Sequence, residues 1–170
     1  DYEHGRTTTE PIALFTSSRT PQVRRNRTCT GGIKMKTTNY YDTFIQVADD
    51  CPVHAAQKPP QKEGEKTVAN IQFEMIRNNP YKYTSDDILF HVYATKNKIN
   101  GKDLEKEREK FFSKGQPCFR SSPLTKRYGW GVHSDSQGKI AIYAVESSEY
   151  KRLSKDKNLK HLKAMRSKRE

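Results

Sequence analysis

Apolar sequence is scarce in this chain of 170 residues, of which only 32% are hydrophobic. A typical soluble domain has about 45–50%, counting glycine. No run of about 18 apolar residues is present, which excludes a membrane-spanning helix. The apolar patch at residues 12–15 is too short for a signal-peptide core and follows acidic residues. We therefore expect one compact cytoplasmic domain with tails, and no membrane partner.

Cysteine is also scarce. The chain has three cysteines, Cys29, Cys51 and Cys118, an odd number with wide spacing. This pattern excludes a disulfide framework and favours a reducing compartment. Cys51 and His54 have a C-x-x-H spacing, and His91 and His133 could join them in space. Zinc needs three or four ligands and only two are local here, so a loop cysteine and a surface histidine are the better interpretation. We expect no metal and no cofactor.

Catalytic signatures are missing as well. The sequence has no G-x-S-x-G, Walker A or G-x-G-x-x-G motif. Cys118 with His133, or Ser121 or Ser122 with a histidine, could form a base-activated nucleophile. Cys118 stands between a proline and a phenylalanine, which indicates a buried, inert thiol. Whether the protein is an enzyme stays open at this stage.

What the chain has in excess is positive charge at its ends. Its net charge is +12 and its pI about 9.6. Residues 1–34 carry six cations and three acids, residues 151–170 carry nine and two, and the middle is left with +2. A basic end attracts phosphates through its long-range field, without a shaped pocket. The alternative is a solvated tail that binds nothing in particular.

The ends also differ in pattern. Residues 1–34 are rich in Thr, Arg and Ser, have no sustained periodicity and end in a Gly-Gly pair, whereas Met35 opens a patterned segment and resembles a natural start. We predict a flexible or non-native extension over 1–34 and a single α+β domain over 35–155. Residues 156–170 are predicted to form a basic C-terminal helix or tail.

Apolar spacing predicts the elements of the domain. Helices are expected at 67–78, 102–113, 149–154 and 159–165, the last with Leu159, Leu162 and Met165 on one face. Strands are expected at 44–47, at 88–94 after a capped turn, near 118–119, and as a hairpin of 128–132 and 139–145; residues 51–64 form a loop. The fold class that follows is α+β, a small, mainly antiparallel sheet with several packing helices.

Residues 120–133 are the best candidate for a binding site. An arginine fork matches phosphate or carboxylate, hydroxyls add donors, and the two glycines beside Trp130 permit a close backbone approach. The alternative is a solvated loop with Tyr128 and Trp130 in the core. The predicted anion site consists of Arg120, Ser121, Ser122, Lys126, Arg127, Tyr128, Trp130 and His133.

Further contacts to nucleic acid are expected from the basic C-terminus, and these would be salt-sensitive and not sequence-specific. Tyr81 and Tyr83, with Trp130, could stack on bases, although anchoring a loop to the core is the more common role of such tyrosines. The predicted C-terminal contacts are Lys160, Lys163, Arg166, Lys168 and Arg169.

Several stretches resemble a family of small bacterial proteins known only as a domain of unknown function, over residues 35–170. The resemblance implies a bacterial-type intracellular protein and supplies no activity, cofactor or catalytic residue. The stretches that carry it are Asn39–Phe44 (NYYDTF), Pro59–Lys62 (PPQK), Asn79–Asp87 (NPYKYTSDD), Arg120–Gly131 (RSSPLTKRYGWG) and Met165–Arg169 (MRSKR).

Three functions remain open. The first is binding of an anionic partner, a nucleic acid or a phosphorylated ligand, through 120–133 and the basic C-terminus. The second is an enzyme acting on a small anionic substrate, with Arg120 and Arg127 as clamps and His133 or Tyr128 as acid or base. The third is an interaction module without a ligand. The oligomeric state does not follow from the sequence.

Overall fold

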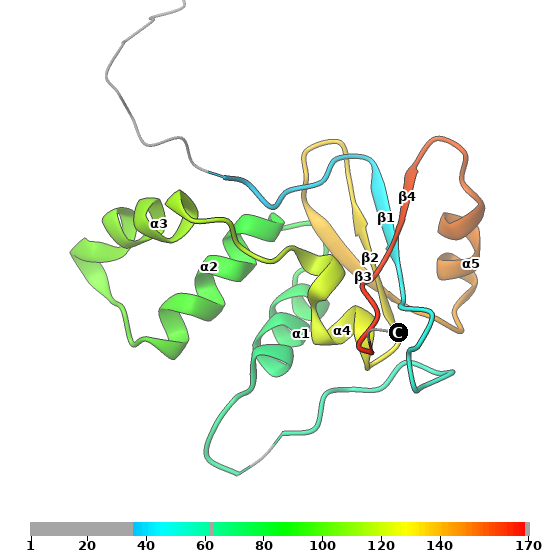
Figure 1. Cartoon of the computed structure of the whole chain (residues 1–170), viewed down its shortest axis with the longest axis horizontal. Helices are drawn as coiled ribbons and strands as arrows, with labels where there is room; N and C mark the ends of the chain where they lie inside the picture. The colour runs from blue at the N-terminus through cyan, green and yellow to red at the C-terminus, as the bar shows by residue number, and fades with distance from the viewer. Residues whose placement is uncertain (1–35, 62, 169–170) are drawn as a thin grey trace, which may run out of the picture. The chain divides into compact units, whose positions relative to one another are not determined.

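The structure is a computed structural model, and it describes residues 36–61 and 63–168. One four-stranded sheet has the order β3-β2-β1-β4 (Figure 1). β2 is antiparallel to β1 and β3, and β4 runs parallel to β1. The strands are β1 (Thr43–Gln46), β2 (Trp130–Ser134), β3 (Ile140–Ala144) and β4 (Lys160–Lys163). The predicted α+β fold is confirmed, while the predicted extension over 1–34 lies outside the described residues.

Helices surround this sheet, and a polar side chain caps most of them. The Thr67 hydroxyl accepts a hydrogen bond from Asn70 N–H, and the Asn70 side chain accepts one from Thr67 N–H, which satisfies two free donors at once. The predicted helices at 67–78, 102–113 and 149–154 are confirmed. The elements are α1 (Val68–Asn78), α2 (Ser85–Lys96), η1 (Gly101–Asp103), α3 (Leu104–Ser113), η2 (Phe119–Ser121), α4 (Pro123–Lys126) and α5 (Ser148–Lys155).

Alternation along the strands gives the sheet two apolar faces. On one face, Phe44 packs against Tyr150 and Leu153 of α5, with the Phe44 and Tyr150 ring centroids 5.0 Å apart. The other face carries the main core under α1, α2 and α4. Its largest members are Ile45, Ile76, Ile88, Phe119, Leu124, Trp130, Val132, Ile140 and Ile142.

The strand predicted at 88–94 is wrong, because these residues lie in α2. A capping box formed by Thr84 and Asp87 starts the helix, and the helix is buried on two sides. Ile88 packs into the main core, whereas Phe90 and Ala94 pack with Phe112 in a separate cluster. Burial on two sides makes the apolar run continuous, and a continuous run does not distinguish a strand from a helix.

Two further expectations are corrected nearer the C-terminus. Phe119 is the first residue of η2 and Cys118 precedes it, so no strand forms there. The basic helix predicted within 156–170 is also wrong, because residues 160–163 form the edge strand β4. Leu159 packs on the α5 side of the sheet and Leu162 in the main core. Residues three apart point to opposite sides of a strand. The spacing of Leu159 and Leu162, which predicted a helix, therefore places one leucine on each face of the sheet.

Candidate functional site

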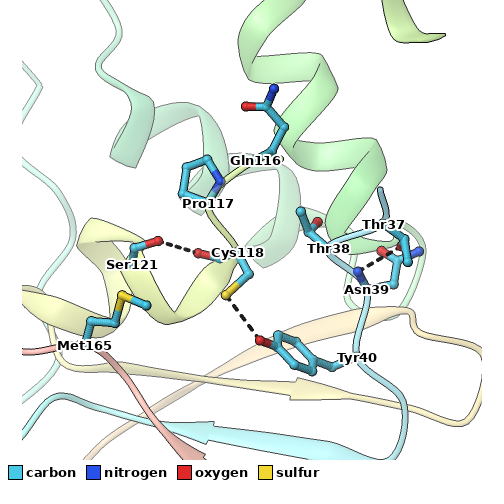
Figure 2. A pocket seen from close by; sticks show the side chains of 9 residues that line it. All are labelled: Thr37, Thr38, Asn39, Tyr40, Gln116, Pro117, Cys118, Ser121 and Met165. Carbon is cyan, nitrogen blue, oxygen red and sulfur yellow. Dashed lines mark hydrogen bonds between the residues drawn. The ribbon is translucent and has the colours of Figure 1, made fainter. Parts of the chain in front are cut away.

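A pocket of about 540 Å³ lies between the segment that precedes β1 and the segment that joins α3 to α4. Figure 2 shows Cys118 in its middle, with Ser121 and Met165 on one side and residues 37–40 on the other. We call it the Cys118 pocket. It is lined by Thr37, Thr38, Asn39, Tyr40, Gln116, Pro117, Cys118, Ser121 and Met165.

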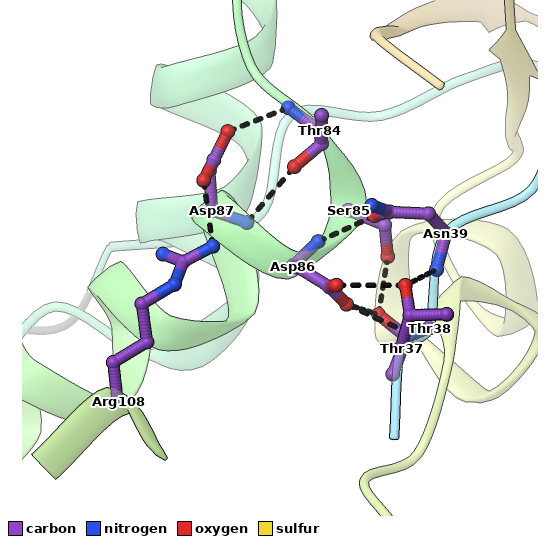
Figure 3. Close-up of polar contacts among 8 residues, drawn as sticks. All are labelled: Thr37, Thr38, Asn39, Thr84, Ser85, Asp86, Asp87 and Arg108. Atoms are coloured by element: carbon purple, nitrogen blue, oxygen red, sulfur yellow. Dashed lines mark hydrogen bonds and ion pairs between the residues drawn. The ribbon is translucent and has the colours of Figure 1, made fainter. Parts of the chain in front are cut away.

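The wall formed by residues 37–39 is held by the first turn of α2 (Figure 3). Asp86 Oδ1 accepts hydrogen bonds from Thr38 N–H at 2.7 Å and from Thr38 Oγ1 at 2.6 Å, and Asp86 Oδ2 accepts one from Thr37 Oγ1 at 2.7 Å. Asp86 N–H donates in turn to Asn39 Oδ1 at 2.9 Å. A carboxylate with several donors rigidifies an otherwise irregular segment, so this wall is fixed before any ligand binds.

The neighbouring carboxylate, Asp87, fixes α2 itself. It accepts hydrogen bonds from Thr84 N–H at 3.1 Å and from Arg108 of α3 at 2.9 Å (Figure 3). Partial burial would raise the pKa of Asp87, but the hydrogen bonds from Thr84 and Arg108 outweigh it and hold the pKa below its usual range. The Thr-Ser-Asp-Asp stretch at 84–87 therefore has a structural role that the sequence alone did not indicate beyond a helix cap.

Inside the pocket, Tyr40 Oη donates a hydrogen bond to Cys118 Sγ at 3.3 Å (Figure 2). Burial, followed by the contact with Cys118, raises the pKa of Tyr40 to about 12, and the nearby charge of Arg120 offsets part of this rise. Tyr40 is therefore a neutral donor at neutral pH. Cys118 is only half-buried, which corrects the expectation of a buried thiol.

Arg120 connects this pocket to the C-terminal strand. Its Nε donates to the carbonyl of Lys163 at 2.9 Å, and its own carbonyl accepts from Met165 N–H at 2.7 Å. The next residue, Ser121, lines the pocket, and so does Met165. The start of the 120–133 segment and the basic C-terminus, which the sequence singled out separately, thus lie side by side.

The remainder of the 120–133 segment is placed elsewhere. Ser122 is buried, caps α4 at Leu124 N–H and donates to Gln72 Oε1 at 2.7 Å. Trp130 is 8% exposed and donates through Nε1 to the Gln57 carbonyl at 2.8 Å. Lys126, Arg127 and Tyr128 follow at the end of α4 and in the turn before β2. Ser121 lines the Cys118 pocket and Arg120 precedes it, whereas Trp130 packs against Phe73 and lines a different pocket of about 470 Å³.

A profile of a family of unknown function, DUF6157, matches residues 35–170. The chain belongs to this family. No curated protein and no solved structure matches it. The DUF6157 segment contains both the Cys118 pocket and the C-terminal strand, and it leaves out the residues predicted to be an extension.

His133 belongs to a second polar group in the DUF6157 segment, on the α5 face of the sheet. Its Nδ1 is 2.7 Å from Tyr81 Oη, which is 2.8 Å from Tyr143 Oη. Burial lowers the pKa of His133, with Asp135 opposing and Arg152 adding to the effect. Burial and Tyr143 raise the pKa of Tyr81. His133, Tyr81 and Tyr143 thus form one hydrogen-bonded chain. Tyr143 was missed because a strand tyrosine gives no sequence signal of its partner.

Exposed cations gather at the C-terminal end of the DUF6157 segment. Between 151 and 168 every Lys and Arg side chain is exposed, and the only acid is Asp156. Arg169, which was predicted to contact nucleic acid, lies outside the described residues. The cations are Lys151, Arg152, Lys155, Lys157, Lys160, Lys163, Arg166 and Lys168.

Two aspartates after β1 fasten this region to the sheet. Asp49 pairs with Lys163 at 2.5 Å. Asp50 accepts from Ser167 N–H at 2.6 Å and from Lys168 N–H at 3.0 Å. The hydrogen bond from Lys168 is the main cause that lowers the pKa of Asp50. These bonds hold residues 163–168 in place, so the cations there are displayed by an ordered backbone.

Within residues 36–61 and 63–168, no three His, Cys, Asp or Glu side chains are grouped so as to hold a metal ion. No helix in this described part of the chain is long and apolar enough to cross a membrane.

Proposed function

We propose that this protein binds a nucleic acid on the surface formed by α5, the turn at 156–159, β4, residues 164–168 and Arg120. We call it the basic surface. The observation that supports the proposal most directly is that eight cations between 151 and 168 are exposed, against one acid. Phosphates are attracted by such an excess, and binding releases their condensed counterions.

The arrangement of the cations adds to this support. Five of them lie on an amphipathic helix and an edge strand, Lys157 lies in the turn between these, and Arg166 and Lys168 lie on the segment after β4 that Asp50 holds. α5 covers one face of the sheet, and β4, which follows it in the chain, is an edge strand (Figure 1). An ordered array loses less side-chain and backbone freedom on binding than a tail that must first be ordered. Asp49 and Asp50 neutralise part of the charge near 163–168, which leaves 151–160 as the more strongly cationic half.

The test is a charge reversal with a matched control. Lys155, Lys157 and Lys160 are exposed on the basic surface; Lys98, Lys102 and Lys106 are exposed around η1 and α3. Both triple Lys→Glu variants change the net charge by the same amount. A fluorescent mixed-sequence oligonucleotide, followed by anisotropy at about 50 and 200 mM salt, is the probe.

We expect the triple variant at 155, 157 and 160 to lose at least tenfold in affinity. We also expect the slope of log K against log salt to become shallower by about two to three, since three phosphate contacts are lost. The triple variant at 98, 102 and 106 should bind within about threefold of the wild type. Equal losses in the two variants would mean that only net charge matters and would contradict a localised surface.

A further inference from the structure

The Cys118 pocket and the basic surface share a border. Met165 lines the pocket and is 48% exposed, and Arg166 follows it. Ser121 lines the pocket and Arg120 precedes it, with Arg120 bonded to both Lys163 and Met165. A chain molecule whose phosphates lie along the basic surface would therefore pass the mouth of the pocket.

The pocket has the size and chemistry of a site for a flat, polar ring. Its volume of about 540 Å³ is in the usual range for small-molecule sites. Tyr40, Pro117 and Met165 supply an aromatic ring, an aliphatic ring and a thioether as walls. Such surfaces pack on the faces of heterocycles.

Two side-chain amides line the same pocket, and their hydrogen bonds fix their orientation. Asn39 Oδ1 accepts from Asp86 N–H, and Gln116 Nε2 donates to the Phe111 carbonyl at 2.7 Å. Within the described residues, Asn39 Nδ2 and Gln116 Oε1 have no protein partner. Asn39 Nδ2 is thus a donor held in a fixed orientation at the wall of the pocket, a group that can pair with the edge of an unpaired base, whereas the Gln116 amide extends away from Cys118 (Figure 2).

We infer that the Cys118 pocket receives one unpaired base of a single-stranded nucleic acid whose phosphates lie on the basic surface. This inference rests on the proposed function and specifies its ligand. A base in a duplex is stacked and paired, and it must be extruded before it can enter a pocket. The protein should therefore bind single strands more tightly than duplexes of the same sequence. Asn39 Nδ2 pairs with the base edge, Tyr40 and Met165 pack on its faces, and Arg120 holds the adjoining phosphate.

The experiment fills the pocket through Cys118. In a C29S/C51S variant, N-ethylmaleimide is attached to Cys118; in the matched C29S/C118S control it is attached to Cys51, which is also a half-buried free thiol but does not line this pocket. The probes are a fluorescent 12-nucleotide single strand, as DNA and as RNA, the matching duplex, and heparin. Intact mass verifies labelling and far-UV circular dichroism verifies the fold.

For the unlabelled protein we expect the single strand to bind about tenfold more tightly than the duplex, the scale of one stacked base. Labelling Cys118 should reduce single-strand affinity about tenfold, to the level of the duplex, and leave duplex and heparin binding unchanged. Labelling Cys51, which follows Asp50 beside the basic surface, should leave the ratio of single-strand to duplex affinity unchanged. If the adduct unfolds the protein, Met165→Ser, which removes the thioether wall at a side chain that is 48% exposed, should weaken only single-strand binding, by several-fold.

The outcomes separate the two proposals. If neither oligonucleotide nor heparin binds the unlabelled protein, the proposed function fails and this inference fails with it. If single strand and duplex bind equally, and the Cys118 adduct affects neither, the inference is overturned and the basic surface stands. If labelling Cys118 lowers the affinity for single strand and for duplex equally, the inference is also overturned, because a pocket for an unpaired base must distinguish the two.

Discussion

Trp130, Gly131 and Val132, near the end of the 120–133 segment, are buried in the sheet, whereas Arg120 and Ser121 at its start stand beside an open pocket. In sequence the two ends look alike, because both place small or polar residues next to a large side chain. In the structure, the end packs against rings on both faces of the sheet. The start makes hydrogen bonds through its backbone and one guanidinium nitrogen.

The difference shows how one distinctive motif can contain two kinds of constraint. At the end, glycine is required by steric contact: a Cβ on Gly131 would lie 2.5 Å from Tyr150 Cε2 and 2.8 Å from Phe44 Cζ. At the start, Arg120 touches the C-terminal strand by two hydrogen bonds and leaves the pocket beside it open. The packed end governs stability, and the open end is available for binding.

Gly131→Ala should have the largest effect on stability. Both rings that meet the new methyl group are buried in the cluster under α5, so neither can move aside cheaply. Overpacking of this kind costs about 1–3 kcal/mol, and here we expect the upper end or more. The free energy of unfolding in urea measures it.

The matched control is Gly115→Ala. The nearest atom to its new Cβ is Lys36 Cδ, the flexible part of a side chain, at 3.9 Å. The free energy of unfolding should therefore change by less than about 0.5 kcal/mol. If Gly131→Ala were as mild as Gly115→Ala, the glycine after Trp130 would not be a packing requirement, and the contrast between the two ends would fail.

Ser121 and Ser122 stand where the segment passes from the pocket to the interior, so their substitution tests the comparison at that point. Ser122 is buried, caps α4 and donates to Gln72 Oε1, so Ser122→Ala should cost about 1–2 kcal/mol by removing a cap and leaving an acceptor unpaired. Ser121 is half-buried and donates only to the Cys118 carbonyl at 2.9 Å. Ser121→Ala should cost about 0.5 kcal/mol or less. Equal urea midpoints for the two variants would contradict this division.

Much of the fold could be predicted from local signals. The helix predicted at 67–78 from its apolar spacing and the hairpin predicted at 128–132 and 139–145 both correspond to elements that the structure contains. The prediction failed where an element is buried on two sides, as in α2, or where residues pair with a distant strand. β4 pairs with β1, more than 100 residues earlier, and no pattern within 156–170 contains that partner.

The candidate site was less predictable than the fold. Arg120 and Ser121 were named from the sequence, because cations beside hydroxyls are a local feature. Tyr40 and Asn39 were missed as site residues, since their approach to 116–121 depends on Asp86 binding Thr37 and Thr38. Contacts between residues about 48 positions apart follow from the tertiary fold, and a single sequence gives no sign of them.

The smallest effect at neutral pH is expected at Tyr40, on the open side of the comparison. Its pKa is about 12 in the folded protein and 10.0 ordinarily. The unfolded chain therefore releases this proton first, and the stability due to neutral Tyr40 is complete below about pH 10 and lost as the pH rises towards 12. Tyr40→Phe should leave unfolding at pH 7 nearly unchanged and flatten the fall in stability between pH 9.5 and 11.5, measured by urea unfolding across that range.

Tyr41→Phe is the matched control, because Tyr41 is 55% exposed and neighbours Tyr40 in sequence. Its alkaline profile should follow that of the wild type. Tyr81 and Tyr150 also have raised pKa values through burial, so some alkaline slope must remain in every variant. If Tyr40→Phe and wild type lose stability in parallel, the Tyr40 hydroxyl is accessible to solvent and its bond to Cys118 contributes nothing. The Cys118 pocket would then admit more water, and be less ordered, than its hydrogen bonds indicate.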